Sequence, residues 1–201
     1  MKKLFMVAAM SLGLIAATNA QETYFGAKTG LNLANVTGDV EENSMLIGFS
    51  VGGFVSVGIS DAFSLQPELL YSTRGTSYDG GNFVTSYLDI PILAKYNFSD
   101  EVHAELGPQI GLLMGASADG TDVKDGYKSM DLGLAIGGGY TLESGIDISL
   151  RYVTSLSSFA EDFESTEITY DAAGMPNGTK VVTKEVDLKH SVIQIAVGYK
   201  F

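Results

Sequence analysis

IQIAVGYKF, residues 193–201, is the stretch of sequence that decides the fold. Every second position from Ile193 to Phe201 carries a large apolar side chain, whereas the positions between them are small or polar. An alternation with period two places these two sets of side chains on opposite faces of a β-strand. We therefore predict that this stretch is a strand with one apolar face.

The same alternation recurs in seven earlier segments, and helical periodicity is scarce. The connections alternate between three-residue turns and longer polar stretches, which is typical of outer-membrane β-barrels. The sequence therefore predicts an all-β protein, an eight-stranded antiparallel up-and-down barrel. The predicted strands are 24–34, 46–59, 63–74, 84–98, 102–115, 130–142, 146–154 and 189–201, the tight turns are 60–62, 99–101 and 143–145, and the loops are 35–44, 75–82, 116–129 and 155–188.

Two features need local exceptions to this regular pattern. Pro67, Pro91 and Pro108 fall inside predicted strands, and a closed barrel has no free edge that could accept a residue without an N–H. We predict local bulges at these prolines. The last loop, 155–188, is long enough that its middle either extends as a hairpin or is mobile.

The first twenty residues form a separate unit. Two lysines precede an apolar run over 4–17, and small residues follow at 18–20. This is the pattern of a cleaved signal peptide over 1–20, so we expect a mature barrel domain, 21–201, that begins at Gln21. The apolar run is shorter than the roughly 20 residues of a membrane helix. The mature chain is therefore either soluble outside the cytoplasm or spans a membrane as strands.

Composition restricts the class of protein further. The length of 201 residues suits one domain, and 45% hydrophobic residues with a mean hydropathy of +0.17 exclude a disordered chain. The net charge of −12 argues against a nucleic-acid partner, whose phosphates need a basic face. The absence of cysteine excludes disulfides and cysteine-based sites. We interpret the acidic loop residues as keeping the loops solvated rather than as cation ligands.

The apolar face of the strands could line a cavity or meet lipid. A soluble lipocalin-like barrel would leave the Gly/Ser-rich face outside, with few of the charges that keep a surface wet. We favour a barrel in a Gram-negative outer membrane, with the apolar face toward lipid. Aromatic residues of that face cluster at the tight-turn end of the strands, as they do in an interfacial girdle. The girdle residues are Phe25, Phe63, Tyr96, Phe98 and Tyr140, with Tyr199 and Phe201 at the same level.

The C-terminal strand strengthens this interpretation. The alternating side chains that close the chain resemble the signal by which the barrel-assembly machinery recognises its clients. We expect that machinery as a partner during biogenesis, and outer-membrane lipid around the mature barrel. With eight strands, both termini lie on the same side, which we expect to be the periplasm. The residues of this predicted assembly signal are Ile195, Val197, Tyr199 and Phe201.

Several short segments carry a family resemblance that covers essentially the whole mature chain. They are GAKTGLN (26–32), QPELLYS (66–72), YLDIPIL (87–93), GP (107–108), DLGL (131–134), RY (151–152) and GYKF (198–201). In order and spacing these segments resemble the PorT-like outer-membrane β-barrel family of the Bacteroidetes. The resemblance implies an OmpA/OmpX-like barrel in which the in-strand prolines are family features. The member that gives the family its name is linked to protein secretion, and nothing in this sequence transfers that role.

The inward-facing positions of the predicted strands carry charges of both signs. An eight-stranded barrel is just wide enough inside for side chains to fill it, so these charges must lie close together. They form either an ion path or binding site, or a structural network that plugs the lumen, because unpaired buried charges are costly. We favour the network, with Lys95 opposite Glu105. It comprises Lys28, Glu68, Arg74, Asp89, Lys95, Glu105, Asp131, Asp147 and Arg151, of which Lys28, Glu68, Asp89 and Arg151 are expected at one level.

Two functions from different classes remain. The first is a non-catalytic barrel whose extracellular loops serve surface interaction or envelope integrity, and the second is a small pore or a transport- or secretion-associated barrel. We favour the first. We expect no enzymatic activity, because His103 and His190 fall at opposite ends and no catalytic or metal constellation can be assembled around either. We also expect a monomer without cofactor or metal, whose loops bind an extracellular ligand or protein.

Overall fold

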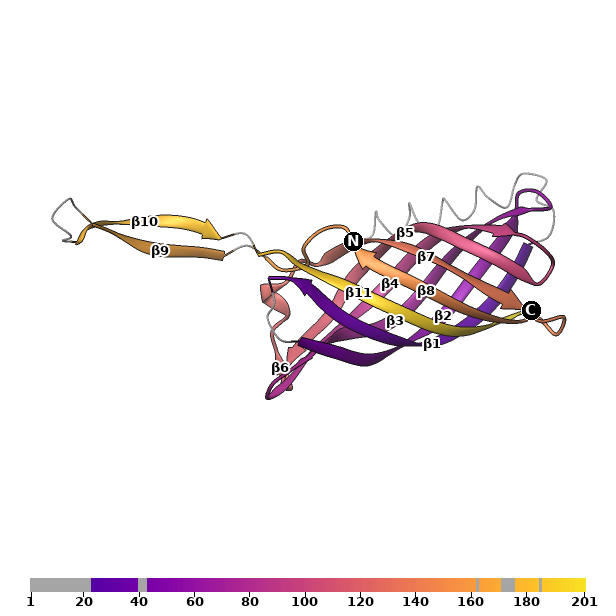
Figure 1. Cartoon of the computed structure of the whole chain (residues 1–201), viewed down its shortest axis with the longest axis horizontal. Coiled ribbons are helices and arrows are strands. Elements are labelled where there is room, and N and C mark those ends of the chain that lie inside the picture. The colour runs from indigo at the N-terminus through magenta and orange to yellow at the C-terminus, as the bar shows by residue number, and fades with distance from the viewer. Residues whose placement is uncertain (1–22, 40–42, 162, 171–175, 185) are drawn as a thin grey trace.

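Most of the described chain is β-strand (Figure 1). The computed structural model describes residues 23–39, 43–161, 163–170, 176–184 and 186–201. Its long strands are β1 (Thr23–Gly38), β2 (Asn43–Gly58), β3 (Phe63–Tyr78), β4 (Gly81–Asn97), β5 (Val102–Ala118), β7 (Met130–Thr141), β8 (Ile146–Ser155) and β11 (Leu188–Lys200). The connections add β6 (Thr121–Asp122), the 3-10 helix η1 (Lys124–Gly126), β9 (Phe163–Tyr170) and β10 (Pro176–Lys184).

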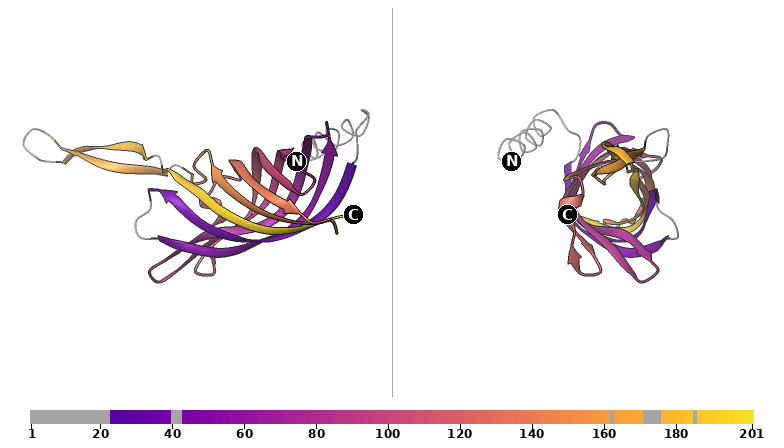
Figure 2. Two further views of the ribbon diagram at one scale, coloured as in Figure 1. Left: turned by 45° about the vertical axis from the view of Figure 1, so that its right-hand side comes forward. Right: turned by 90° about the vertical axis from the view of Figure 1, so that its left-hand side faces the viewer.

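The eight long strands form a closed antiparallel ring in the order β1-β2-β3-β4-β5-β7-β8-β11. β1 closes the ring, because it pairs with β2 on one side and with β11 on the other. The end-on view of Figure 2 shows the resulting barrel. The predicted eight-stranded up-and-down barrel is therefore confirmed. In this order β1 faces β5, β3 faces β8 and β4 faces β11 across the interior.

The tight turns lie where the sequence predicts them, at 60–62, 99–101 and 143–145. Each turn is closed by a backbone hydrogen bond from the end of one strand to the start of the next, so the strands on either side keep their register. These bonds run from Ile59 N to Phe63 O at 2.8 Å, from Phe98 N to Val102 O at 2.9 Å and from Leu142 N to Ile146 O at 2.7 Å.

The predicted loop over 75–82 is wrong. β3 and β4 stay paired until Tyr78 faces Gly81, and only Asp79 and Gly80 remain as a turn, with Gly80 at a φ of +100°. The last residues of β3 are polar on both faces, and a period-two pattern cannot distinguish such a strand from a loop. Backbone pairing continues there because it does not need apolar side chains.

The other long connections also contain more regular structure than the sequence predicts. β1 and β2 extend into the predicted loop 35–44, and the predicted loop 116–129 contains β6 and η1. Within 155–188, β9 and β10 pair antiparallel as a separate two-stranded sheet. The hairpin alternative for this connection is therefore correct, and Figure 1 shows the hairpin projecting beyond the barrel.

The in-strand prolines do not produce the bulges that we predicted at them. Pairing runs without a register shift through Pro67 in β3–β4, Pro91 in β4–β5 and Pro108 in β5–β7. Each proline instead interrupts the pairing with the strand on its other side, where two consecutive residue pairs are missing from the ladder. Proline has no N–H to donate there. The ring thus accommodates each proline by losing local pairing rather than by inserting a residue. Within the ring, the register shifts lie between Met45 and Ser50 on β2 and between Ser86 and Tyr87 on β4.

The two faces of the strands differ sharply in exposure. On the outer face, Leu31 is 56%, Ile136 54% and Ile195 47% exposed, although all three are apolar and lie within long strands. On the inner face the charged side chains are buried. An apolar band that faces outward, with polar groups inside, is the arrangement expected of a strand barrel surrounded by lipid.

The aromatic residues of the predicted girdle lie on the outer face near the tight turns. Phe63 packs against Tyr96 with ring centroids 4.9 Å apart, and Tyr96 packs against Phe98 at 5.0 Å. Tyr199 and Phe201, which also belong to the predicted assembly signal, pack at 5.5 Å. Phe25, Tyr140, Ile195 and Val197 are likewise exposed on this face. Roles in membrane anchoring and in assembly stay predictions for these residues.

The predicted signal peptide, 1–20, lies outside the described residues. Within the part of the chain that the structure describes, no helix has the length and apolar content needed to cross a membrane.

Candidate functional site

Arg151 of β8 and Glu68 of β3 meet across the barrel, because their strands face each other in the ring. Nη1 and Nη2 of Arg151 donate to the two Glu68 carboxylate oxygens at 2.9 Å each, and Nε donates to Glu105 Oε1 at 2.8 Å. Lys28 Nζ lies 3.3 Å from Glu68 Oε1. We call these four residues the central cluster. Arg151 is only 1% exposed, so these charge-assisted bonds form out of contact with water.

Two inward glycines make room for the long charged side chains. Gly137 pairs with both Glu105 and Arg151, and a Cβ there would lie 2.5 Å from the Leu150 carbonyl oxygen, 2.9 Å from Arg151 Cα and 3.2 Å from Arg151 Cβ. A Cβ at Gly111 would lie 2.7 Å from Arg74 Nη2 and 2.9 Å from Asp89 Oδ1. A larger residue at either position would therefore displace a member of the charge network.

A second group of charges lies between the central cluster and the long loops. Arg74 Nη2 donates to Asp89 Oδ1 at 2.9 Å, and Nη1 lies 3.6 Å from Asp131 Oδ2. The guanidinium Cζ stands 4.0 Å from the ring centroid of Tyr87, within cation–π range. Ser155 Oγ donates to Asp131 Oδ2 at 2.9 Å. We call Arg74, Asp89 and Asp131 the loop-side cluster.

Aromatic rings cover the loop-side cluster. Phe159 stacks on His190 with ring centroids 4.0 Å apart, and Tyr87 meets His190 edge-on at 5.6 Å. Tyr127 and Phe83 pack on Phe159 at 5.7 and 6.1 Å. Phe159 is 0% and His190 1% exposed, so these five rings form an aromatic cap that closes the interior at the loop end.

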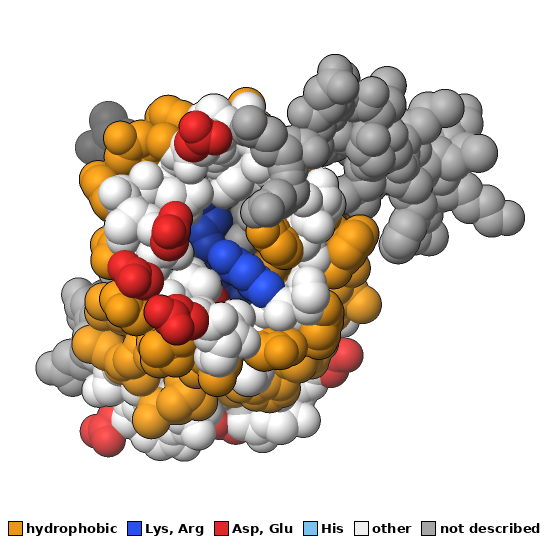
Figure 3. Space-filling view, turned by 90° about the vertical axis from the view of Figure 1, so that its right-hand side faces the viewer, with side chains coloured by type: hydrophobic (Ala, Val, Ile, Leu, Met, Phe, Trp, Pro, Cys, Tyr) orange, Lys and Arg blue, Asp and Glu red, His pale blue; other side chains and the backbone are white. Residues whose placement is uncertain are grey.

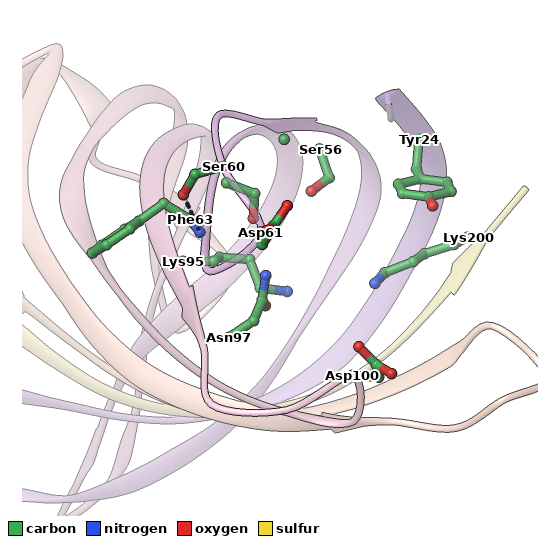
Figure 4. A pocket seen from close by; sticks show the side chains of 11 residues that line it. Tyr24, Ser56, Ser60, Asp61, Phe63, Lys95, Asn97, Asp100 and Lys200 are labelled. Atoms are coloured by element: carbon green, nitrogen blue, oxygen red, sulfur yellow. Dashed lines mark hydrogen bonds between the residues drawn. The ribbon is translucent and has the colours of Figure 1, made fainter. Parts of the chain in front are cut away.

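The interior is open at the tight-turn end. A cavity of about 530 Å³ lies there, which we call the vestibule (Figure 4). Lys95 lines the inner end of this cavity, on the side toward the central cluster. Its Nζ lies 3.9 Å from Asp147 Oδ2 and donates to Gln66 Oε1 at 3.3 Å. His103 Nδ1 lies 3.7 Å from the same Asp147 oxygen, to which Thr141 Oγ1 donates at 2.8 Å. Figure 3, which views this end, shows basic side chains in the central hollow and acidic ones around its edge.

The structure places all nine residues of the predicted charge network on the inner face, each at most 5% exposed. It brings Lys28, Glu68 and Arg151 together, but Asp89 belongs to the loop-side cluster instead. Lys95 and Glu105 are register partners as predicted, although Lys95 lies near Asp147, and Glu105 accepts a bond from Arg151.

Sequence reasoning missed the aromatic cap. Tyr87 and His190 occupy inward positions in the strand pattern, but Phe159 lies in a connection without periodicity, so no local signal marks it as buried. The acidic loop residues do not form a metal site among the described residues. Among the residues that the structure describes, no three His, Cys, Asp or Glu side chains are grouped to hold a metal ion.

A model of the family described as outer membrane protein beta-barrel domain matches residues 19–161. The chain belongs to this family. The barrel is accordingly an outer-membrane protein, in agreement with its outward apolar band. No curated protein matches the sequence closely enough to indicate a relative.

Solved outer-membrane proteins share the fold of this barrel. Neisserial surface protein A is 16% identical, with a TM-score of 0.53, over 91% of this chain and 99% of that one. Ail, the attachment invasion locus protein of Yersinia pestis, solved with the heparin analogue sucrose octasulfate, is 13% identical with a TM-score of 0.50. That match covers 90% of this chain and 100% of Ail. At these identities the likeness concerns the fold alone.

Removing Arg151, one of the two cations of the central cluster, should destabilise this outer-membrane barrel strongly. Arg151→Met leaves Glu105 and Glu68 buried with less compensation, so we expect a loss of about 3–5 kcal/mol in the free energy of unfolding. Lys189→Met is the matched control, because its 2.7 Å pair with Asp187 is solvent-exposed; we expect a loss of about 0–1 kcal/mol. Urea unfolding in phospholipid vesicles measures both values.

The reason for the loss can be tested separately. Adding Glu105→Gln to Arg151→Met removes the uncompensated charge and leaves Glu68 paired with the remaining cation, Lys28, so it should recover most of the lost stability. Equal losses for Arg151→Met and Lys189→Met would contradict the importance of the central cluster.

Proposed function

We propose that this protein is a non-catalytic outer-membrane barrel that presents an acidic interaction surface at its loop end, while its charge-filled lumen stays closed. The observation that carries the proposal is the hairpin of β9 and β10. Within the described chain these two strands pair only with each other, so both of their outer edges are unpaired. Such edges can accept a strand from a partner.

The base of the hairpin is attached firmly to the barrel. Phe159 N donates to Leu188 O at 2.9 Å, and Lys128 N donates to Phe159 O at 2.8 Å. Ser158 Oγ donates to Val186 O at 2.6 Å. The connection that carries the hairpin is therefore held by both the β5–β7 loop and the start of β11. An anchored base supports a role in presenting the hairpin to a partner.

The charge of the loop end favours a basic partner. The stretches 35–44, 75–82, 116–129 and 155–188 together contain fourteen Asp and Glu residues and four Lys. Complementary charge steers association and suppresses partners of like charge. A heparin analogue, which Ail was solved with, is a polyanion and would meet like charge here. We therefore propose a cationic protein segment, and not a sulfated polysaccharide, as the partner.

Barriers at two heights along the barrel axis support the closed lumen. The Arg151–Glu68 pair joins opposite walls at the centre, and Phe159 fills the loop end. A small apolar cluster adds to these barriers inside the barrel, comprising Ala34, Leu93, Ala135, Val153 and Val192. A small pore, the competing function, would need a path past all of them.

We further propose that both termini face the periplasm and that the barrel is PorT-like. β1 begins and β11 ends at the tight-turn end, which faces the periplasm in outer-membrane barrels. The PorT-like proposal rests on the order and spacing of the segments between 26–32 and 198–201.

The closed lumen predicts an electrically silent protein. The mature chain in planar bilayers should give no steady ion-sized openings. A variant with Arg151→Ser, Glu68→Ser and Phe159→Ala removes the central bridge and the cap, and should open more often. Steady openings of the unmodified protein would show that the lumen conducts. A folded triple variant that stays silent would show that these two barriers are not what closes it.

The orientation predicts which connections are exposed on cells. An epitope inserted between β9 and β10, within 171–175, should bind antibody on intact cells. The same epitope in the tight turn 143–145 is the control, and should bind only after the outer membrane is permeabilised. The reverse result would place the termini outside.

The acidic surface predicts binding of a basic peptide. Fluorescent tetralysine should bind the barrel in phosphatidylcholine nanodiscs with a steep salt dependence. Replacing 163–184 with a short Gly-Ser linker should weaken binding about tenfold because it removes both unpaired strand edges, although it removes only three of the fourteen loop-end carboxylates. Glu143→Gln, in a tight turn, is the matched control and should leave binding unchanged. Binding that survives loss of the hairpin, or tighter binding of heparin than of tetralysine, would contradict the proposal.

A further inference from the structure

The vestibule at the tight-turn end has the size of a ligand site and a polar, charged lining. Its volume of about 530 Å³ falls within the range of small-molecule pockets. Its lining combines two lysines, two aspartates, one tyrosine and hydroxyl and amide groups. None of these groups is required by the loop-end function proposed above.

Two lysines enter the vestibule from opposite walls. Lys95 lies on β4 and Lys200 on β11, and these strands face each other in the ring. In Figure 4 both side chains project into the cavity, and Tyr24 lies above Lys200, whose Nζ is 5.8 Å from the ring centroid. Beyond its bond to Gln66, the Lys95 ammonium keeps donor capacity, because an ammonium group carries three N–H bonds. The inner part of the vestibule is therefore suited to an anionic group.

Two aspartates flank the same cavity in the turns. Asp61 lies in the β2–β3 turn and Asp100 in the β4–β5 turn, and both are exposed whereas Lys95 is buried. Among the described residues, neither aspartate forms an ion pair with Lys95 or Lys200. The vestibule thus has one buried cation, Lys95, at its inner end, whereas Lys200 is half-buried at the end of β11 and both carboxylates are exposed at the mouth. Charges of both signs therefore line the cavity.

The vestibule leads no further into the barrel. From Lys95 toward the centre of the barrel, the interior contains Gln66 and Asp147, and then the central cluster. A molecule that enters from the turn end must leave the same way, which suits a binding site rather than a pathway. This step rests on the closed lumen proposed above, whereas the charge pattern of the vestibule does not.

We propose that the vestibule binds a small zwitterion of peptide type, such as the free end of a short peptide. The ligand carboxylate lies between Lys95 and Lys200, and its ammonium group faces Asp61 and Asp100. Asn97, which also lines the cavity, supplies an amide that can hydrogen-bond a peptide backbone. With the turn end toward the periplasm, the site would take peptides from that compartment.

Three probes of nearly equal size test separately how much each of the ligand's two charges contributes to binding. Triglycine is a zwitterion, N-acetyltriglycine keeps only the carboxylate, and triglycinamide keeps only the ammonium group. The mature protein in neutral detergent micelles is titrated with each, and amide resonances are followed by NMR. Triglycine should shift resonances at Asn97 and Lys200, and the other two probes should bind about tenfold more weakly.

Two substitutions assign the ligand's ends. Lys200→Gln should weaken triglycine and N-acetyltriglycine about fivefold to tenfold and leave triglycinamide unchanged. Asp100→Asn should weaken triglycine and triglycinamide by a similar factor and leave N-acetyltriglycine unchanged. Lys124→Gln and Asp122→Asn at the loop end are the matched controls, and should change nothing. Both vestibule positions lie outside the central cluster, and the heat-dependent gel mobility of each variant checks that it is folded.

Several outcomes would overturn the proposal. These are no shift with triglycine at any soluble concentration, equal binding of all three probes, or a triglycine affinity that is unchanged in both vestibule variants. A conducting lumen or an inert hairpin would contradict the proposed function but leave the charge-specific binding test intact.

Discussion

The pairing of β1 with β11 closes the sheet, and the rest of the structure depends on that closure. Thirteen residue pairs, from Gly26↔Lys200 to Gly38↔Leu188, join the first and last strands. In the hydrocarbon of a bilayer an unpaired backbone N–H or C=O has no water to bond, so a sheet with a free edge cannot span it. Closure also assigns the two faces of every strand. The apolar set must meet lipid and the polar set must share a narrow interior.

That narrow interior explains why the charges of the central cluster pair across the ring. Arg151 reaches Glu68 on the facing strand because eight strands leave no space for a hydrated gap between the walls. Burying such a pair does not necessarily stabilise the barrel more than apolar residues of the same volume would. Once one member is present, however, the others are required, since an uncompensated buried charge costs more than the pair contributes.

The two ends of the barrel differ because their connections differ. Tight turns cannot fold back over the opening, so the turn end keeps a cavity between Lys95 and Lys200. The long connection before β9 does fold back, and it seats Phe159 on His190. The same connection carries the hairpin outward. In the function that we propose, one segment therefore both closes the lumen and displays the interaction surface, while the opposite end keeps a cavity lined by polar residues.

The sequence by itself determined the strands, the tight turns and the inward-facing set of charges, because a period of two assigns each side chain to a face without reference to distant residues. Only the tertiary structure decided the partners within that set. Glu68 and Arg151 are 83 residues apart in the chain, and Asp89 joins Arg74 rather than Glu68. Which inward side chains share a level depends on the stagger of the closed ring, as does the tolerance of Pro67 without a bulge. Phe159 lies outside every periodic segment, so its burial follows from how its connection folds over the barrel and not from any local pattern.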